Sequence, residues 1–195
     1  MGFFSLILGY LLGSIPSGWL AGRWLKGIDL RELGSGSTGA TNVLRQVGKG
    51  PALVVFLIDV GKGAAAVLIA RALGLGDWIQ VLAGLTALAG HIWPVWLNFK
   101  GGKAVATGFG MFLGLAWPVG LASFGVFLLT LWLFRIVSLS SVLAAVSLPL
   151  LMICFSGIGS YILIALVAMG LVLWRHRSNR AGILEGSEPK VGQKD

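Results

Sequence analysis

PALVVFLIDVGKGAAAVLIARAL, residues 51–73, is apolar almost throughout and long enough to cross a bilayer, which takes about 20 residues. The rest of the chain has the same character. Hydrophobic residues make up 56% of the 195 residues and charged residues only 11%, against about 25% charged in a soluble domain. The sequence therefore predicts an all-α, polytopic transmembrane helix bundle, organised as a single domain over residues 1–195.

Similar apolar segments predict about seven spans. They cover residues 3–22, 51–73, 78–97, 104–117, 119–134, 137–155 and 159–174. The fourth is short for a full crossing, so it could instead be a tilted or partly re-entrant segment. Protein or water would then have to provide hydrogen bonds to its backbone. No Lys or Arg precedes the first segment, as it would in a secretory signal peptide, so we expect a retained first helix.

The positive charges predict the orientation of these spans. With the N-terminus outside, thirteen of the 15 Lys and Arg fall on the cytoplasmic side. They are Arg23, Lys26, Arg31, Arg45, Lys49, Lys100, Lys103, Arg135, Arg175, Arg177, Arg180, Lys190 and Lys194. Cytoplasmic loops collect such residues. We therefore expect a cytoplasmic C-terminus with a short polar tail over residues 181–195, and no nucleic-acid partner.

Two charged residues lie inside the second span. Asp59 and Lys62 are three residues apart, which places them on one helix face. An ionisable residue within a span is a candidate for function, but an internal ion pair that supports packing is the reading we prefer. The single cysteine, Cys154, has no charged neighbour in sequence and is interpreted as inert packing.

Three polar stretches interrupt the apolar chain, and the predicted orientation places all of them on the cytoplasmic face. The first runs from Gly34 to Asn42. Its glycine spacing resembles a nucleotide phosphate loop, but Ala40 replaces the essential lysine and no strand precedes it. Its glycines still allow backbone N–H groups to form an anion nest, to which the serine, threonine and asparagine side chains add donors. We interpret it as a ligand-binding loop rather than a connector.

The second stretch begins at His91, where Pro94 is expected to bend or end the helix. It continues to Lys100-Gly101-Gly102-Lys103, in which two ammonium groups flank a Gly-Gly turn. Lysine binds phosphate as a compact charge. The pattern favours an anion site over lysines that only reflect the excess of positive charge in cytoplasmic loops. A capping or interface role for His91 stays open.

The third stretch is Arg175-His176-Arg177-Ser178-Asn179-Arg180, at the end of the last span. Its arginines suit the membrane boundary, and His176 is the natural acid–base group near neutral pH. The sequence contains no metal-ligand pattern, and no metal or other cofactor is expected. A serine–histidine–acid triad has weak support, because neither Ser35 nor Ser37 has glycines two residues to each side.

In these three stretches the chain resembles the bacterial acyl-phosphate:glycerol-3-phosphate acyltransferases, integral membrane enzymes of phosphatidic acid synthesis. Their motif G-S-x-N-x-G-A-T-N matches Gly34 to Asn42. Their motif G-H-x-x-P through F-K-G-G-K-G-V-A-T matches Gly90 to Thr107, and R-H-x-x-N matches Arg175 to Asn179. There are departures: Ser37 stands where most members have Asn, Ala104 replaces a Gly, and Arg180-Ala181-Gly182 follows the third motif.

The resemblance implies transfer of a fatty acyl group from acyl phosphate to the 1-hydroxyl of glycerol 3-phosphate, giving lysophosphatidic acid and phosphate at the cytoplasmic face of the bacterial inner membrane. The implied catalytic residues are Ser35, Ser37, Lys103, His176 and Asn179. The implied binding residues are Gly36, Thr38, Gly39, Thr41, Asn42, Arg45, His91, Lys100, Gly101, Gly102 and Arg175. We expect the first loop to hold acyl phosphate. Glycerol 3-phosphate is expected on Arg45, Lys103, His176 and Asn179, with His176 or a substrate phosphate as the base.

Two other classes remain open at this level. A transporter of a phosphorylated anion would share the spans, but it would place polar groups near the bilayer midplane. A lipid-binding scaffold would not need three donor-rich loops. Acyl-CoA-dependent acyltransferases carry His-x-x-x-x-Asp, whereas Trp96 and Ala181 occupy the matching positions here. Oligomeric state and acyl-chain preference are left open.

Overall fold

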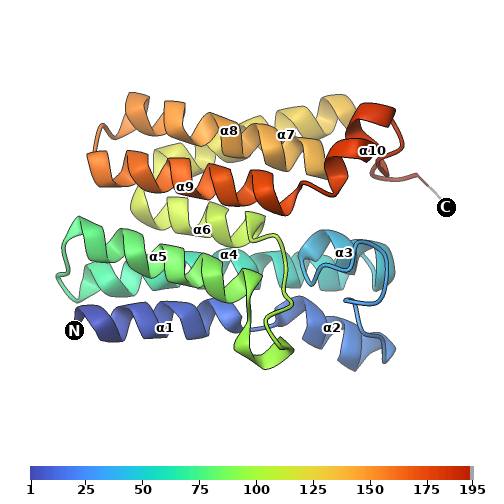
Figure 1. Cartoon of the computed structure of the whole chain (residues 1–195), viewed down its shortest axis with the longest axis horizontal. Helices are drawn as coiled ribbons and strands as arrows, with labels where there is room; N and C mark the ends of the chain where they lie inside the picture. Colours follow the sequence, from blue (N-terminus) through green and yellow to red (C-terminus); the bar gives the residue numbers. More distant parts are fainter. Residues whose placement is uncertain (194–195) are drawn as a thin grey trace. The chain divides into compact units, whose positions relative to one another are not determined.

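The computed structural model describes residues 1–193 and is helical throughout, with no strand among these residues (Figure 1). This confirms the predicted all-α class. The α-helices are α1 Gly2–Ser14, α2 Ser17–Lys26, α3 Ala40–Gln46, α4 Lys49–Ala72, α5 Asp77–Ile92, α6 Val105–Leu115, α7 Trp117–Phe134, α8 Val137–Phe155, α9 Gly159–Arg175 and α10 Asn179–Glu185, with a short 3-10 helix η1 at Val95–Leu97. Lys194, counted above with the cytoplasmic charges, lies outside the described residues.

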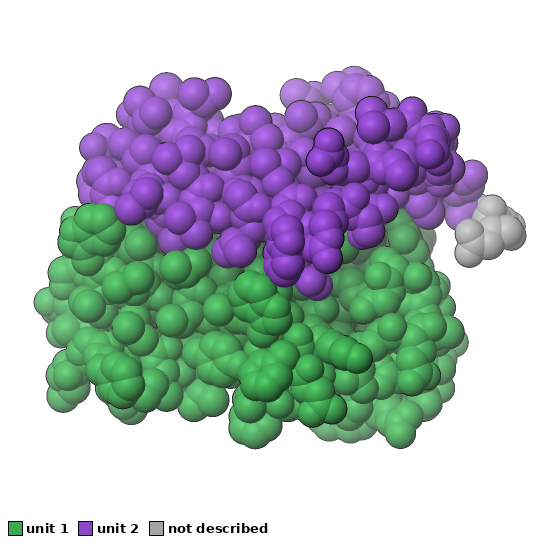
Figure 2. Space-filling view, in the orientation of Figure 1, with its two compact units in different colours: residues 1–115 green, residues 116–195 purple. Residues whose placement is uncertain are grey.

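The chain forms two compact units, Met1–Leu115 and Ala116–Asp195, which are coloured separately in Figure 2. The first and second polar stretches belong to the first unit, and the third belongs to the second. The single domain over residues 1–195 stays a prediction.

Helices of the first unit approach one another through glycines. A Cβ at Gly63 would lie 2.0 Å from the carbonyl oxygen of Thr107, and one at Gly110 would lie 1.9 Å from that of Val60. Between α1 and α5, a Cβ at Gly13 would lie 2.1 Å from the carbonyl oxygen of Ala87. Such close backbone contact needs small residues, as in other membrane helix pairs.

The first predicted span is broken, contrary to the single helix expected over residues 3–22. Helix α1 ends at Ser14 and α2 begins at Ser17, so Ile15 and Pro16 lie between two helices. Proline has no N–H and its ring clashes with the preceding helical turn, which explains the break. The two helices together, Gly2–Lys26, still form one span-length apolar segment.

Five segments of the described chain are long and apolar enough to cross a membrane. They are Gly2–Lys26, Lys49–Ala72, Asp77–Leu97, Trp117–Phe134 and Val137–Phe155. Helices α9 and α10 meet at 73° and provide a sixth if they form one bent span. Helix α6 has 11 residues, about 16 Å at 1.5 Å per residue, which is short for a crossing of about 30 Å. The seven spans and their orientation therefore stay predictions.

The second unit consists of α7, α8 and α9, joined by short connections, and α10 with the tail that follows. Ser123 of α7 donates a hydrogen bond to the carbonyl oxygen of Ala144 in α8 (3.0 Å). Cys154 is exposed on α8, so it does not pack in the interior of this unit, and its inert character stays a prediction. The predicted tail, residues 181–195, begins inside α10. Val191 in this tail is bound to the rest of the unit, because its N–H donates to the carbonyl oxygen of Arg135 (2.7 Å).

Candidate active site

The first polar stretch is built around Asn42, which is 1% exposed. Its side-chain amide group lies 3.0 Å from the carbonyl oxygens of Leu30 and Leu33 and 2.9 Å from that of Ser37. Its side-chain oxygen accepts a hydrogen bond from the Ser35 N–H (3.3 Å). Asn42 therefore organises the loop from beneath, and this contact set favours a supporting role over the direct binding role predicted for it.

Two glycines give this loop its path. Gly34 and Gly36 have φ of 57° and 65°, in the left-handed region that only glycine adopts without strain. A Cβ at Gly34 would also lie 2.4 Å from the side-chain oxygen of Asn42. Alternation of left-handed and ordinary backbone is the geometry of an anion nest, so the local backbone suits the predicted phosphate loop.

The hydroxyl groups of the loop differ in access. Ser35 is exposed, whereas Ser37 and Thr38 are 8% and 5% exposed. The Ser37 hydroxyl accepts a hydrogen bond from the Gly39 N–H (3.3 Å), so part of its capacity is used within the loop. Ser35 is therefore the serine better placed to meet a ligand. Of the other residues predicted to bind in this stretch, Thr41 is half-buried and Arg45 is exposed.

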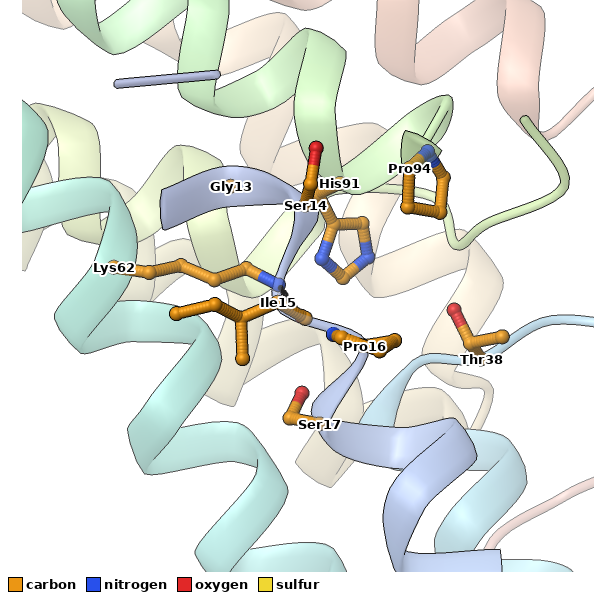
Figure 3. Close-up of a pocket in the computed structure, with 9 residues that line it drawn as sticks. All are labelled: Gly13, Ser14, Ile15, Pro16, Ser17, Thr38, Lys62, His91 and Pro94. Atoms are coloured by element: carbon orange, nitrogen blue, oxygen red, sulfur yellow. Dashed lines mark hydrogen bonds between the residues drawn. The ribbon is translucent and has the colours of Figure 1, made fainter. Parts of the chain in front are cut away.

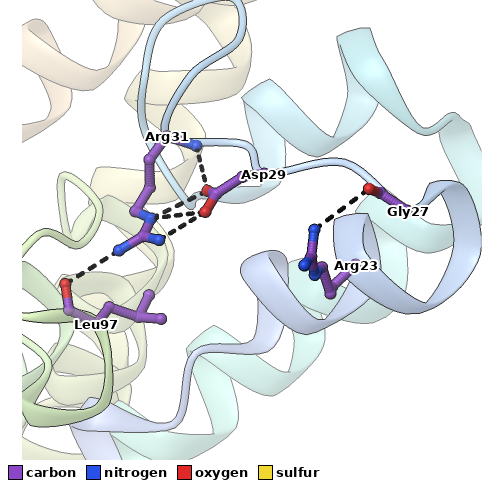
Figure 4. Close-up of polar contacts among 5 residues, drawn as sticks. All are labelled: Arg23, Gly27, Asp29, Arg31 and Leu97. Carbon is purple, nitrogen blue, oxygen red and sulfur yellow. Dashed lines mark hydrogen bonds and ion pairs between the residues drawn. The ribbon is translucent and has the colours of Figure 1, made fainter.

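An ion pair ties the loop to the second stretch (Figure 4). Arg31 Nε lies 3.0 Å from Asp29 Oδ1, and Arg31 Nη1 donates to the carbonyl oxygen of Leu97 (3.2 Å). Hydrogen bonds from Arg31 hold the pKa of the Asp29 carboxyl well below its usual range, and Asp29 raises the pKa of Arg31. Sequence reasoning missed this link. The Asp-x-Arg spacing hints at the pair, but nothing local indicates Leu97.

The second stretch folds back on the end of α5. The N–H groups of Gly101 and Gly102 donate to the carbonyl oxygens of Ile92 (3.1 Å) and His91 (3.0 Å). A Cβ on Gly101 would lie 2.2 Å from the His91 carbonyl oxygen, and one on Gly102 would lie 2.2 Å from His91 Nε2. Close packing on His91 thus explains the Gly-Gly pair, for which a shaped anion site was the sequence interpretation. Lys100 is exposed and Lys103 is half-buried, one on each side.

Beneath this loop, Asp59 and Lys62 form the predicted ion pair, with 2.8 Å between Lys62 Nζ and Asp59 Oδ1. Two residues from distant parts of the sequence join them. Ser17 donates a hydrogen bond to Asp59 Oδ1 (2.7 Å), and His91 Nδ1 lies 3.6 Å from the same oxygen. The structure thus brings His91 of the second stretch to the ion pair.

The first and second stretches meet at a small pocket (Figure 3). It is lined by Gly13, Ser14, Ile15, Pro16, Ser17, Thr38, Lys62, His91 and Pro94. Lys62 reaches from α4 toward the break between α1 and α2. Thr38 from the first stretch and His91 from the second thus line the same pocket, while a joint substrate site stays a prediction.

The third stretch has a histidine with a defined hydrogen bond. His176 is 3% exposed, and its Nδ1 lies 2.8 Å from the carbonyl oxygen of Val172. A carbonyl oxygen only accepts, so Nδ1 carries the proton in the neutral ring and Nε2 is the basic nitrogen. This is the tautomer that a general base at Nε2 needs.

Asn179 is held by an acidic residue that sequence reasoning missed. Asn179 Nδ2 donates to Glu188 Oε1 (2.6 Å), and the Ser138 hydroxyl donates to the same oxygen (2.7 Å). Glu188 therefore connects the third stretch to the start of α8. Glu188 lies in the polar tail, and nothing in the sequence around it indicates this contact.

The arginines of the third stretch lie beside an aromatic ring. The guanidinium carbons of Arg175 and Arg177 lie 5.5 Å and 4.9 Å from the ring centre of Trp174. Cation–π contacts at such distances orient arginine side chains over the ring. Arg175 is half-buried, and its predicted role in substrate binding stays a prediction.

Together, the helical fold and its span-length apolar helices define an integral membrane protein. The sequence profile of glycerol-3-phosphate acyltransferase matches residues 3–186. The chain therefore belongs to the glycerol-3-phosphate acyltransferase family of integral membrane enzymes.

Relatives support this family over nearly the whole chain. The glycerol-3-phosphate acyltransferase of Parasynechococcus marenigrum strain WH8102 is 74% identical over 189 residues, which is 97% of this chain and 89% of the relative. That of Prochlorococcus marinus strain MIT 9313 is 70% identical over 97% of this chain and 94% of the relative.

Two crystal structures of PlsY, an integral membrane glycerol 3-phosphate acyltransferase, are similar in fold. The glycerol 3-phosphate form has a TM-score of 0.93 at 40% identity, covering 98% of this chain and 96% of that one. The lysophosphatidic acid form has a TM-score of 0.89 at 38% identity, covering 98% and 95%. This membership favours the enzyme over the transporter and the scaffold considered from sequence.

Proposed function

We propose that this acyltransferase uses acyl phosphate as its donor and acylates the 1-hydroxyl of glycerol 3-phosphate, releasing lysophosphatidic acid and inorganic phosphate. The observation that carries the proposal is the loop from Gly34 to Asn42, whose left-handed glycines and hydroxyl groups are fixed by the buried Asn42 in a form suited to phosphate. The glycerol 3-phosphate and lysophosphatidic acid forms of the similar PlsY structures fit this acceptor and this product.

The first stretch is proposed to hold the acyl phosphate. Ser35 and Ser37 supply hydroxyl donors. The N–H groups of Ser35, Gly36 and Gly39 already donate within the loop, so the backbone donors proposed for the substrate are those of Ser37 and Thr38, between the two glycines. Anchored on buried Asn42, these donors are set before the substrate arrives. Donors fixed in advance lower the barrier where negative charge develops, here on the departing phosphate.

Glycerol 3-phosphate is proposed to bind cationic and amide side chains, namely Arg45, Lys103, His176 and Asn179. Lys100 and Arg175 add positive charge that attracts both phosphorylated substrates. Glu188, by accepting from Asn179 Nδ2 at 2.6 Å, orients the amide so that its oxygen faces away from the carboxylate. Gly101 and Gly102 act through the path of their loop, and Thr41, in the first turn of α3, is proposed to bind the phosphate of the substrate.

The proposed reaction is a single transfer. The acceptor hydroxyl oxygen bonds to the acyl carbon, the bond from that carbon to the phosphate oxygen breaks, and phosphate leaves with the electron pair. The hydroxyl proton passes to His176 Nε2 or to a substrate phosphate oxygen. An acyl phosphate is a mixed anhydride with a good leaving group, so alignment and charge neutralisation supply most of the rate. No cofactor enters the scheme.

We place the reaction at the cytoplasmic face of the bacterial inner membrane, on the strength of the cation distribution. The acyl chain then lies in the bilayer while both phosphates remain in water.

A donor comparison tests the proposal. Purified protein is given radiolabelled glycerol 3-phosphate with either palmitoyl phosphate or palmitoyl-CoA, and lysophosphatidic acid is quantified. We expect product with palmitoyl phosphate and none above background with palmitoyl-CoA. Equal turnover with both donors would show that the donor assignment is wrong, while family membership would stand.

A further inference from the structure

A cluster of buried polar side chains in the first unit is given no contact with substrate in the proposed reaction, although the resemblance counted one of them, His91, among the binding residues. It consists of Ser17, Asp59, Lys62, His91 and Thr107, and we name it the Asp59 cluster. Its members come from α2, α4, α5 and α6, and each is at most 8% exposed. Buried ionic groups contribute little net stability, so their presence calls for another role.

One side of the cluster holds the break between α1 and α2. Lys62 Nζ donates a hydrogen bond to the carbonyl oxygen of Ile15 (3.1 Å), and Ser17, just after the break, donates to Asp59 (2.7 Å). Non-helical backbone within a span requires such partners. This side of the cluster therefore has a structural purpose.

The other side reaches the second polar stretch through His91. Its Nδ1 lies 3.2 Å from the hydroxyl of Thr107 and 3.6 Å from Asp59 Oδ1. The opposite ring nitrogen lies against Gly102, where an added Cβ would be 2.2 Å away. The ring is therefore held on one edge by the cluster and supports the glycine loop with the other.

The neighbouring pocket is too small for substrate. Its volume is about 10 Å³, the room of roughly one water molecule. A phosphate group, with five heavy atoms, does not fit. The Asp59 cluster therefore acts on its surroundings rather than on a bound phosphate.

We infer that Thr107 and Asp59 are positioning residues for the Lys100–Lys103 loop, acting through the ring of His91. Thr107 holds the His91 ring at Nδ1, and the ring sets how closely Gly102 can approach it. Lys103 is the next residue in the sequence, so its position depends on that of Gly102. The inference rests on the proposed function in one respect, the role of Lys103 in binding glycerol 3-phosphate.

Thr107→Val tests it, because valine keeps the shape and removes only the hydroxyl. The N–H groups of Gly101 and Gly102 donate to the end of α5, so loosening the loop should accelerate their hydrogen exchange. We expect exchange over residues 99–103 about fivefold faster, and a KM for glycerol 3-phosphate about fivefold higher, as for loss of one neutral hydrogen bond. We expect kcat within about twofold of wild type.

Two further variants separate the hydroxyl from packing. Thr107→Ser keeps the hydroxyl and should restore both the exchange rate and KM. Thr130→Val is the matched control, since Thr130 is also buried, at 6% exposure, and its hydroxyl donates to Val126 within its own helix (2.8 Å). It should leave both quantities unchanged.

Wild-type exchange over residues 99–103 in Thr107→Val would overturn the inference, and so would a Thr107→Ser variant as impaired as the valine. If Thr107→Val does not fold, Thr107→Ala takes its place; it also removes the methyl group, so recovery in Thr107→Ser again has to assign the effect to the hydroxyl. Lys103→Ala separates a failure of the proposed function from a failure of this inference. A wild-type KM in that variant would remove Lys103 from substrate binding. Faster exchange in Thr107→Val would still support the positioning role.

Discussion

Lys103 is the residue on which the proposed binding of glycerol 3-phosphate depends most. It is half-buried at the end of a loop whose glycines pack directly on His91. A charge-assisted contact in a partly desolvated site is stronger than one in water. We expect Lys103→Ala to raise KM for glycerol 3-phosphate and to lower kcat/KM by on the order of 10². Lys100→Ala, at an exposed position in the same loop, is the control and should lose less.

Ser35 and Ser37 are proposed to bind phosphate rather than to attack the acyl group. Each alanine variant should lower activity by roughly 10- to 10³-fold, the range for one electrostatic donor. Because Ser35 is exposed and the Ser37 hydroxyl already accepts from Gly39, we expect the larger loss for Ser35→Ala. Kinetics of both variants give the measurement.

The same serines decide between one transfer step and two. A covalent mechanism would leave an acyl-enzyme when the protein is quenched with acyl phosphate alone. Mass spectrometry should find no stoichiometric adduct, and a palmitoyl group on either serine would replace direct transfer with a two-step route.

At the scale of elements, Glu188 links α10 and the following tail to the start of α8. Its Oε1 accepts hydrogen bonds from Asn179 (2.6 Å) and Ser138 (2.7 Å). Bonds to a charged acceptor are worth about 1.5–3 kcal/mol. We expect Glu188→Ala to lower kcat/KM by on the order of 10² and Glu188→Gln, which keeps one acceptor oxygen, by about tenfold or less. Glu185→Gln, at an exposed position in α10, should have no effect, and equal losses in all three would disprove specific orientation of Asn179.

The Asp29–Arg31 pair links the first loop to η1 through Leu97. Its side chains are 15% and 27% exposed, so the pair should contribute only about 0.2–1 kcal/mol to the free energy of unfolding. The pKa of Asp29 is lowered by its hydrogen bonds with Arg31, so this contribution is present above the unfolded value of about 3.9 and is lost only as pH falls through the folded value.

Asp29→Asn should therefore lower Tm by about 1–4 °C, and by the same amount at pH 6 and at pH 8. Thermal unfolding in detergent measures this, with Glu185→Gln as the control at an exposed position in α10. A difference in Tm that grew between pH 6 and pH 8 would contradict the assigned pKa direction.

For the whole molecule, the orientation in the membrane is the property that places the proposed chemistry on one side. Cys154 is exposed on α8 and has no proposed role, so Cys154→Ser should keep activity within about twofold. That variant provides a cysteine-free background. Gly76→Cys and Lys190→Cys then report on the two predicted sides, because both positions are exposed and a Cβ at Gly76 meets nothing within 4 Å.

In intact cells with a permeable outer membrane, a membrane-impermeant maleimide should label Gly76→Cys and spare Lys190→Cys. Inverted inner-membrane vesicles should show the reverse. Labelling of both from the same side would disprove the predicted topology.

Composition and local spacing were enough to predict several features. The helical membrane class follows from the length and apolarity of segments such as residues 51–73. The pairing of Asp59 with Lys62 follows from helix periodicity, since residues three apart share a face. The three polar stretches were also recognisable, because their donors lie close together in the sequence.

Only the tertiary structure decided how these donors are supported. The partner of Asp59 at Ser17 is 42 residues away, that of Arg31 at Leu97 is 66 away, and that of Ser138 at Glu188 is 50 away. Local spacing carries no information about such contacts. Pro16 can be read from the sequence. The sequence does not show, however, that Lys62 of another helix binds the backbone at the break. Hydrogen-bond partners of buried polar groups are selected by three-dimensional proximity, which arises only when the helices pack.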